Sequence, residues 1–279
     1  KLKNFQRAAL AYLLRGNPRK VLALDTGLGK TAVASAYARI RQSRTLWITK
    51  PSLVQNLTRE IRKLTGQNAL ALTGTSPSAP QLESLQDTSI QHIIMTYDSL
   101  SRSHMKDDNG IDIGSMWALA ISACHFDLLV VDEAHNMKNR STGRWKVISK
   151  IAKIPSVLFL TATPLVNNGL DFFALLNVLD PNTFGSEAEF IRAYLSFDGK
   201  RILSPKKMQA DLLPYMFRRK KTDVLKDLPA KIRQHHNINL SGEWKKRYDD
   251  VLQGIYTDLS GETVDVPDVM IAQINRFRQ

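Results

Sequence analysis

Six short runs of apolar residues recur along the first part of this chain, and stretches with the periodicity of amphipathic helices separate them. The apolar runs span residues 21–24, 45–48, 69–72, 92–95, 128–131 and 157–160. Each run is continuously apolar rather than alternating, which is typical of strands that are buried on both faces. Helical patterns lie between them, at residues 31–42, 52–64, 115–124 and 141–152. Strands that alternate with helices predict an α/β fold with a mostly parallel central sheet flanked by helices.

The alternation of strands and helices is interrupted twice and then ends. Residues 73–89 and 101–114 are polar, and we expect surface loops there. After residue 180 the pattern becomes largely helical, with one further strand candidate at 233–240. We therefore expect two parts, a sheet domain over residues 1–180 and a helical extension over residues 181–279.

The charge of the chain favours a polyanionic partner. Lys and Arg number 39 against 26 Asp and Glu, which gives a formal net charge of +13. The surplus is uneven, because residues 1–79 hold 14 basic and 2 acidic side chains whereas residues 80–199 are net negative. Basic surfaces attract polyanions such as nucleic acids, although solubility alone would also account for such a charge.

Other features exclude several classes of protein. No apolar run approaches the roughly 18–20 residues that cross a bilayer, and no signal peptide opens the chain. Cys124 is the only cysteine, which excludes an internal disulfide and a multi-cysteine zinc site. We expect an intracellular protein with no membrane partner. Because the chain begins with Lys1 rather than Met, we also expect it to be part of a longer protein.

A glycine-rich loop follows the first predicted strand and opens the next helix. It consists of Asp25, Thr26, Gly27, Leu28, Gly29, Lys30 and Thr31. Such a loop binds phosphate because backbone N–H groups and a helix N-terminus converge on the oxygens, while the Lys reaches the outer phosphates and the next hydroxyl binds Mg²⁺. The first glycine of the usual spacing would fall at Leu24, so the loop departs from the strict pattern. Its place between strand and helix favours a nucleoside triphosphate site over an ordinary glycine turn.

An acidic pair is the second chemical signal. Asp132 and Glu133 directly follow the apolar run at 128–131. In a phosphate-loop NTPase this is where the sheet presents a carboxylate to Mg²⁺. Asp132 would bind the ion, and Glu133 would orient and deprotonate the attacking water. A lone pair of this kind could be a solvated strand end, but together with Lys30 it predicts ATP or GTP hydrolysis.

Several further blocks resemble those of one family. The segment Asp132-Glu133-Ala134-His135 is a motif of helicase superfamily two, and the chain looks like the first motor lobe of the Swi/Snf-type DNA translocases. The other blocks that resemble this family are Phe5-Gln6, Lys50-Pro51-Ser52, Thr96-Tyr97-Asp98, Lys138-Asn139, Leu160 to Pro164, Asp171 to Pro181, and Phe217 to Val224 with Leu228 to Lys231.

The resemblance implies a role for each matching residue. Gln6 would read adenine, and residues 25–31 would bind ATP. Thr31 and Asp132 would hold Mg²⁺, with Lys30, Asp132 and Glu133 as the catalytic residues. Backbone contacts to DNA would come from Lys50, Pro51, Ser52, Thr96, Tyr97, Lys138 and Asn139. Coupling of nucleotide state to DNA would involve Thr161, Ala162 and Thr163.

The resemblance also implies a function. Residues 1–180 would be a RecA-like ATP-binding lobe, and residues 181–279 a helical protrusion and brace that lead toward a second lobe of the same protein. The complete protein would be an ATP-dependent translocase on double-stranded DNA. It would move along the DNA backbone without recognising the base sequence and without separating the strands. Because the second lobe supplies arginines that stabilise the transition state, we expect the isolated chain to be nearly inactive.

Two alternatives remain open from the sequence. An RNA helicase lobe of the same superfamily would share Lys30 and the acidic pair, but it should lack the basic segment at 218–221. A non-catalytic, nucleotide-gated DNA-binding module would have the same fold but would not hydrolyse the nucleotide. We expect a cytoplasmic location for a bacterial or phage protein and a nuclear location otherwise.

Overall fold

The computed structural model describes residues 2–102, 104–106, 112–162, 169–224, 241–252, 255–257 and 263–265. The chain divides into two compact units, Lys1–Leu228 and Pro229–Gln279. The second unit contains helix α13 (Gly242–Leu252) and an antiparallel pair of strands, β10 (Ile255–Thr257) and β11 (Thr263–Asp265). The strand expected at 233–240 lies outside the described residues. The expected boundary after residue 180 falls inside the first unit, and a functional division there stays a prediction.

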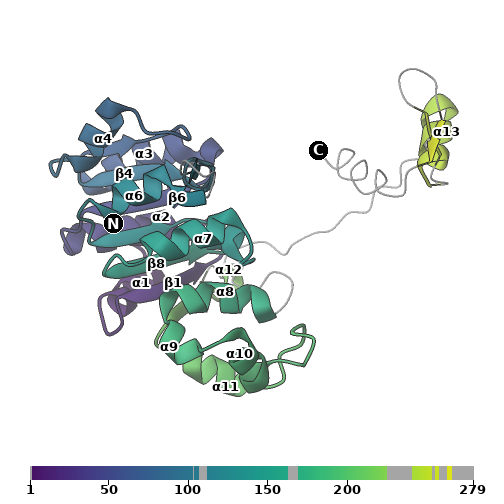
Figure 1. Cartoon of the computed structure of the whole chain (residues 1–279). Coiled ribbons are helices and arrows are strands. Elements are labelled where there is room, and N and C mark those ends of the chain that lie inside the picture. The colour runs from purple at the N-terminus through teal and green to yellow at the C-terminus, as the bar shows by residue number, and fades with distance from the viewer. Residues whose placement is uncertain are drawn as a thin grey trace. The chain divides into compact units, whose positions relative to one another are not determined.

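The first unit is built on a seven-stranded sheet in the order β3-β4-β2-β7-β8-β1-β9, and all of its pairings are parallel (Figure 1). This confirms the predicted α/β class and the six predicted strands. The strands are β1 (Arg19–Leu24), β2 (Thr45–Thr49), β3 (Ala69–Ala71), β4 (His92–Thr96), β7 (Leu128–Val131), β8 (Ser156–Thr161) and β9 (Met216–Arg219).

Helices cover both faces of this sheet. The helices of the sheet region are α1 (Asn4–Leu13), α2 (Lys30–Ile40), α3 (Val54–Thr65), α4 (Ala79–Gln86), α5 (Tyr97–Ser101), α6 (Met116–Ser122) and α7 (Gly143–Ile151), with 3-10 turns η1 (Pro51–Leu53) and η2 (Ala134–Met137). The extension adds α8 (Gly169–Leu179), α9 (Pro181–Phe184), α10 (Glu187–Tyr194), α11 (Pro205–Leu212) and α12 (Lys221–Val224). No helix in the described part of the chain has the length and apolar composition needed to cross a bilayer.

The buried residues of each strand alternate between two cores, because successive side chains of a strand point to opposite faces. In β7, Leu129 and Val131 belong to one core while Leu128 and Val130 belong to the other. The second of these cores also contains side chains of α1, α2 and α3, and the first contains those of α5 to α11. Both faces are therefore covered, which explains why the strands are continuously apolar in sequence.

Two expectations about local structure are wrong. The stretch 73–89 contains helix α4, which begins after Ser78 with reciprocal capping between Ser78 and Gln81. The stretch 101–114 contains an antiparallel pair, β5 (His104–Lys106) and β6 (Asp112–Ser115). The described region from residue 181 to residue 224 is largely helical, as expected, and it also contains β9, an unexpected strand that pairs in parallel with β1.

Arg19, the first residue of β1, connects the sheet to the helical extension through hydrogen bonds. Its guanidinium donates hydrogen bonds to the carbonyls of Ala152 and Ile154 beyond α7, and to those of Val178 and Leu179 at the end of α8. A planar group with five donors satisfies several C-terminal carbonyls at once, which otherwise lack partners within their helices. The extension is thus joined to the sheet by polar contacts as well as by the shared core.

The parallel arrangement places every candidate site segment at one edge of the sheet. The strands β1, β2, β4, β7 and β8 end at Leu24, Thr49, Thr96, Val131 and Thr161, directly before the segments singled out in the sequence. In open α/β sheets, ligands bind beyond the carboxyl ends of the strands. A ligand site is therefore expected at this edge.

His92 is a fully buried histidine that the fold holds in its neutral form. Its Nδ1 accepts a hydrogen bond from Trp47 Nε1 at 3.3 Å, so its Nε2 carries the proton and faces Gln67 Oε1 at 3.2 Å. Burial lowers the pKa of His92 to about 4 from its ordinary value of 6.5. Because the folded pKa lies below the unfolded one, the stabilising contribution is complete above pH 6.5 and is lost as the pH falls toward 4.

We predict that the free energy of unfolding falls by about 2 kcal/mol between pH 7 and pH 5 through His92 alone. The His92→Gln variant should lose this part of the pH dependence, as measured by urea unfolding at both pH values. His125→Gln, at an exposed histidine, should retain it. Equal pH dependence in the wild type and in His92→Gln would contradict the assignment.

Candidate functional site

The loop between β1 and α2 adopts the curled backbone expected of a phosphate loop. Gly27 and Gly29 have φ values of 85° and 79°, in the left-handed region that favours glycine. Leu28 N donates to Asp25 O at 3.1 Å within the turn, and α2 begins directly after it at Lys30. The N–H groups of this turn and of the first turn of α2 form a site suited to an anion.

Lys30 connects this loop to the acidic pair. Its side chain is largely buried, with 9% of the residue exposed, and its Nζ donates to the carbonyl of Leu24 at 3.3 Å. The same Nζ lies 3.9 Å from Glu133 Oε1. Two motifs that are far apart in sequence, the glycine loop and the acidic pair, therefore meet at one corner of the sheet.

Asp132 and Glu133 lie directly beyond the end of β7. Burial and the adjacent charge of Glu133 raise the pKa of Asp132, while the hydrogen bond from Thr49 and the charge of Lys30 act in the opposite direction. Thr49 Oγ1 donates to Asp132 Oδ2 at 3.2 Å, and His135 Nδ1 lies 3.2 Å from Glu133 Oε2. Two neighbouring carboxyl groups in a partly buried corner repel each other, so a bound cation would stabilise them.

The residues present fit a magnesium ion bound together with phosphate. Thr31, the second residue of α2, supplies a hydroxyl next to Lys30, and Asp132 supplies a carboxylate. The described residues contain no group of three or more His, Cys, Asp or Glu side chains that could hold a metal by themselves. Mg²⁺ usually takes one or two protein oxygens and completes its shell with water and substrate phosphate, so this donor set matches it.

Gln6 lies against the loop. Its Nε2 donates to the carbonyl of Leu28 at 3.0 Å, and its Oε1 accepts from the backbone N–H of Lys3 at 2.8 Å. A Cβ on Gly29 would lie 2.5 Å from Gln6 Nε2, so a larger residue there would displace the Gln6 amide, and the positive φ independently favours glycine. The structure places Gln6 beside the loop, and its reading of adenine stays a prediction.

The predicted DNA-contacting residues fall into an exposed group and a buried group. Lys50, Pro51 and Ser52 are exposed at the carboxyl end of β2. Thr96 and Tyr97 are 4% and 1% exposed, and Thr96 Oγ1 accepts a hydrogen bond from Ser99 N as the N-cap of α5. A cavity of about 330 Å³ adjoins both groups and is lined by Pro51, Val54, Gln55, Thr73, Gly74, Thr75, Thr96, Asp98, Ser99 and Arg102.

The other predicted residues that the structure describes lie along the same edge. Lys138 Nζ is 3.9 Å from Asp171 Oδ2 on α8, and Asn139 Oδ1 accepts from Ser141 N at 2.9 Å. Thr161 is the fully buried last residue of β8, and Ala162, which follows it, is half-buried. Thr163 lies outside the described residues.

Sequence reasoning missed the contact between the basic segment and the phosphate loop. Lys221 N donates to Asp25 Oδ2 at 2.8 Å, and Asp25 N donates to Arg219 O at 3.2 Å. Lys221 Nζ would lie 3.5 Å from a Cβ on Gly27. The parallel pairing of β9 with β1 produces these contacts, since Leu24 and Arg219 are register partners. The apolar Met216-Phe217 before the basic residues was the only local signal of that strand.

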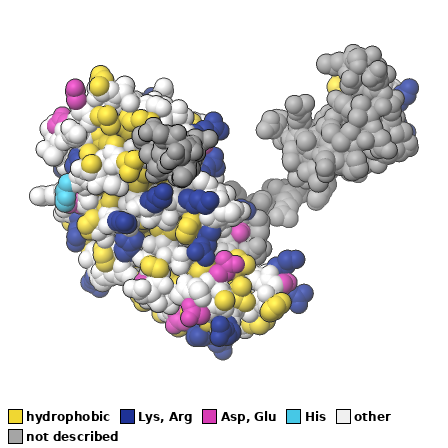
Figure 2. Space-filling model, viewed as in Figure 1, with side chains coloured by type: hydrophobic (Ala, Val, Ile, Leu, Met, Phe, Trp, Pro, Cys, Tyr) yellow, Lys and Arg dark blue, Asp and Glu magenta, His cyan; other side chains and the backbone are white. Residues whose placement is uncertain are grey.

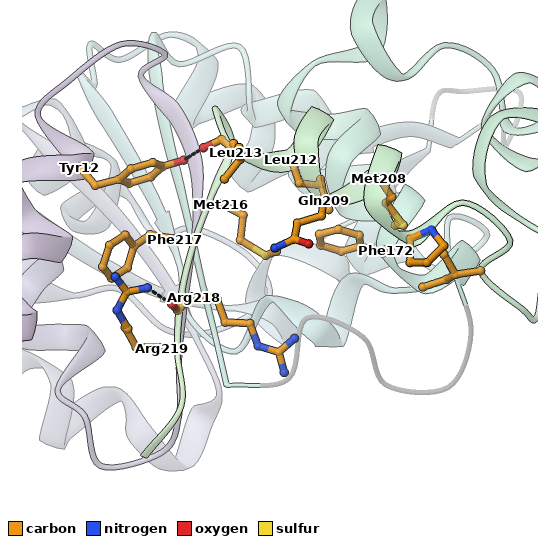
Figure 3. A pocket seen from close by; sticks show the side chains of 12 residues that line it. Tyr12, Phe172, Met208, Gln209, Leu212, Leu213, Met216, Phe217, Arg218 and Arg219 are labelled. Atoms are coloured by element: carbon orange, nitrogen blue, oxygen red, sulfur yellow. Dashed lines mark hydrogen bonds between the residues drawn. The ribbon is translucent and has the colours of Figure 1, made fainter. Parts of the chain in front are cut away.

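A second cavity, of about 500 Å³, lies beside β9 (Figure 3). Figure 3 shows Tyr12 and Phe217 on one side of it, with Met208, Leu212 and Phe172 on the other. The Tyr12 and Phe217 rings are 5.4 Å apart between centroids. Most of its lining is apolar, so this cavity suits a charged phosphate chain less well than the loop at Lys30 does, although Arg218 and Arg219 also line it.

Known proteins resemble this chain over almost all of its length. Residues 5–275 match the family model of the SNF2-related domain. The chain is 29% identical over 275 residues to Chromodomain-helicase-DNA-binding protein 6 of Rattus norvegicus, covering 93% of this chain and 10% of that protein. It is 27% identical over 279 residues to Protein CHROMATIN REMODELING 5 of Arabidopsis thaliana, covering 93% of this chain and 15% of that protein. The chain thus spans only a small part of the length of these relatives.

The fold also matches a solved structure. The Sulfolobus solfataricus SWI2/SNF2 ATPase core in complex with dsDNA superposes with a TM-score of 0.62 at 20% sequence identity. The match covers 99% of this chain and 57% of that chain. At this identity, the likeness supports the RecA-like fold and nothing finer.

We predict that Gly29→Ala weakens Mg-ATP binding at least tenfold, because the new methyl group displaces the Gln6 amide that contacts the loop. Gly16→Ala is the matched control, since Gly16 also has a positive φ, 64°, but has nothing within 4 Å of the added Cβ. Both variants should lose about 1–2 kcal/mol of unfolding free energy from the left-handed backbone. Titration calorimetry should show the loss of affinity only in Gly29→Ala, and an equal loss in both would contradict the assignment.

Proposed function

The chain belongs to the SNF2-related family, and from this membership and the corner formed by Lys30 and Glu133 we propose that it is the first, ATP-binding lobe of an ATP-dependent double-stranded DNA translocase. The observation that supports the proposal most strongly is the 3.9 Å separation of Lys30 Nζ and Glu133 Oε1. A nucleoside triphosphate on the glycine loop would contact Lys30 at its outer phosphates. The acidic pair would then lie on the far side of the same phosphates.

The backbone and side-chain groups at this corner of the sheet would each have a different role in ATP hydrolysis. The N–H groups of residues 27–31 and the ammonium of Lys30 hold the phosphate oxygens. Thr31 and Asp132 would hold the metal, and bound Mg²⁺ would neutralise charge on the outer phosphates. Glu133 accepts a proton from the attacking water and aligns that water with the terminal phosphorus. Its contact with Lys30 would hold the carboxylate next to the reacting group.

The DNA partner is supported by charge and by position. The chain has a net charge of +13, and Lys50, Pro51 and Ser52 are exposed next to a cavity on the same edge of the sheet as the nucleotide corner. Helix α7 carries Arg144, Lys146 and Lys150, and Figure 2 shows Lys and Arg side chains over this helix. Contacts of this kind go to phosphates, so we expect sequence-independent binding that weakens steeply with salt.

A second RecA-like lobe would complete the site. In phosphoryl transfer, an arginine supplied from outside the phosphate loop stabilises the charge of the transition state and contributes roughly 10³–10⁵ in rate. Such an arginine would approach Lys30 and Glu133 from the carboxyl edge of the sheet. We therefore infer that this chain alone hydrolyses ATP very slowly and that the complete protein hydrolyses it when DNA is bound.

We predict that Glu133→Gln in the complete protein lowers the DNA-stimulated kcat at least a thousandfold while Mg-ATP affinity changes less than about threefold. The amide keeps the size of the side chain, but it cannot accept a proton from water. Phosphate release assays and titration calorimetry measure the two effects. Glu83→Gln, at an exposed position on α4, is the control, and an unchanged kcat in Glu133→Gln would remove Glu133 from its proposed role.

The same assay separates the proposal from the RNA helicase alternative. Duplex DNA should stimulate the complete protein, and single-stranded RNA should not. Stimulation by RNA alone would favour the alternative. Absence of any nucleic-acid stimulation, with intact ATP binding, would favour a non-catalytic module.

A further inference from the structure

Glu133 is held in a backbone conformation that non-glycine residues rarely adopt. Its φ and ψ are 49° and 50°, in the left-handed region, and the only other non-glycine residue with positive φ in the described part of the chain is Gln42. Such conformations persist only where surrounding contacts fix them, and they cluster at functional sites. The contacts of this peptide segment therefore decide where the Glu133 carboxylate points.

Hydrogen bonds from two side chains fix the segment. Tyr97 Oη donates to the carbonyl of Asp132 at 2.7 Å, and it lies 3.4 Å from the carbonyl of Glu133. Asn136 donates to the carbonyl of Glu133 through its side-chain Nδ2 at 2.6 Å and through its backbone N–H at 3.0 Å. Both carbonyls of the acidic pair are thus held from outside β7.

The hydroxyl of Tyr97 comes from a rigid position. Tyr97 is the first residue of α5, directly after β4, and only 1% of it is exposed. In the sheet order, β2 lies between β4 and β7, so the side chain reaches across the end of β2 to the acidic pair. Burial raises the pKa of Tyr97 well above 10, so the hydroxyl remains a donor at every working pH.

We propose that Tyr97 is a positioning residue for ATP hydrolysis, whose hydroxyl, together with the Asn136 amide, holds Asp132-Glu133 in the left-handed turn that directs the Glu133 carboxylate toward Lys30. The inference rests on the proposed function of Glu133 as the base. This role differs from the contact with DNA that the family resemblance implied for Tyr97. It agrees with the burial of the Tyr97 side chain. Tyr97 touches neither the substrate nor the metal in this role, and it acts through the backbone of its neighbours.

The test compares two tyrosines that each lose one hydroxyl. In the complete protein, Tyr97→Phe should lower kcat for ATP hydrolysis at least tenfold and change the Kd for Mg-ATP less than about twofold. The matched control is Tyr194→Phe, because the Tyr194 hydroxyl is also in a partly buried hydrogen bond, to Asp211 Oδ2 at 2.8 Å, but lies in the helical extension. Asn136→Ala, which removes the other side-chain donor, should lower kcat in the same direction as Tyr97→Phe.

A double-mutant comparison distinguishes positioning from general destabilisation. In a Glu133→Gln background, adding Tyr97→Phe should change the residual rate less than about twofold, because the side chain that it positions no longer acts as the base. A further tenfold loss in that background, or equal kcat in Tyr97→Phe and Tyr194→Phe, would overturn the inference. If Glu133→Gln itself left kcat unchanged, the proposed function would fail instead, so the two failures are distinguishable.

Discussion

The parallel pairing of β1, β8 and β7 is the constraint on which the site depends. β8 lies between the other two strands, with Leu22 opposite Leu160 and Val131 opposite Phe159 in register. Because all three strands run in the same direction, the glycine loop after β1 and the acidic pair after β7 emerge at one edge. The result is the 3.9 Å approach of Lys30 to Glu133. Neither motif alone would form the proposed site, since the glycine loop would bind phosphate and the acidic pair would supply the carboxylates.

The electrostatics of this corner follow from burial. Asp132 and Glu133 are neighbouring carboxyl groups that are partly removed from water, and the pKa of Asp132 is raised by its burial and by Glu133. Lys30 and the Thr49 hydroxyl offset part of this cost. A corner that holds excess negative charge on one side, and backbone N–H groups with a lysine on the other, suits a cation bound to a polyphosphate. The left-handed turn at Glu133 adds a geometric requirement, which Tyr97 and Asn136 meet.

Much of this architecture was predictable because it rests on local patterns. The six buried strands are continuous apolar runs, and the rule that parallel strands end at one edge is enough to bring Lys30 near Asp132 and Glu133. Strand β9 was not predictable in this way, since its residues are only half-buried or exposed and it needs the free edge of β1. Helix α4 buries a single residue, Leu85, so its apolar periodicity is weak, although the Ser78 and Gln81 cap was a usable signal. The burial of Tyr97 depends on helices α6 and α7, which pack against α5, and its hydroxyl contacts the carbonyl of Asp132, so no local pattern predicts it.

A crystal structure of the chain with magnesium and a non-hydrolysable ATP analogue is the most direct test of the proposed site. We predict that the outer phosphates contact the Lys30 ammonium and the N–H groups of residues 27–31. The metal should lie about 2.0–2.1 Å from the Thr31 hydroxyl and either the same distance from Asp132 or one water molecule away from it. The Glu133 carboxylate should then face the terminal phosphorus. A nucleotide bound away from Lys30, or an acidic pair turned away from the phosphates, would contradict the account.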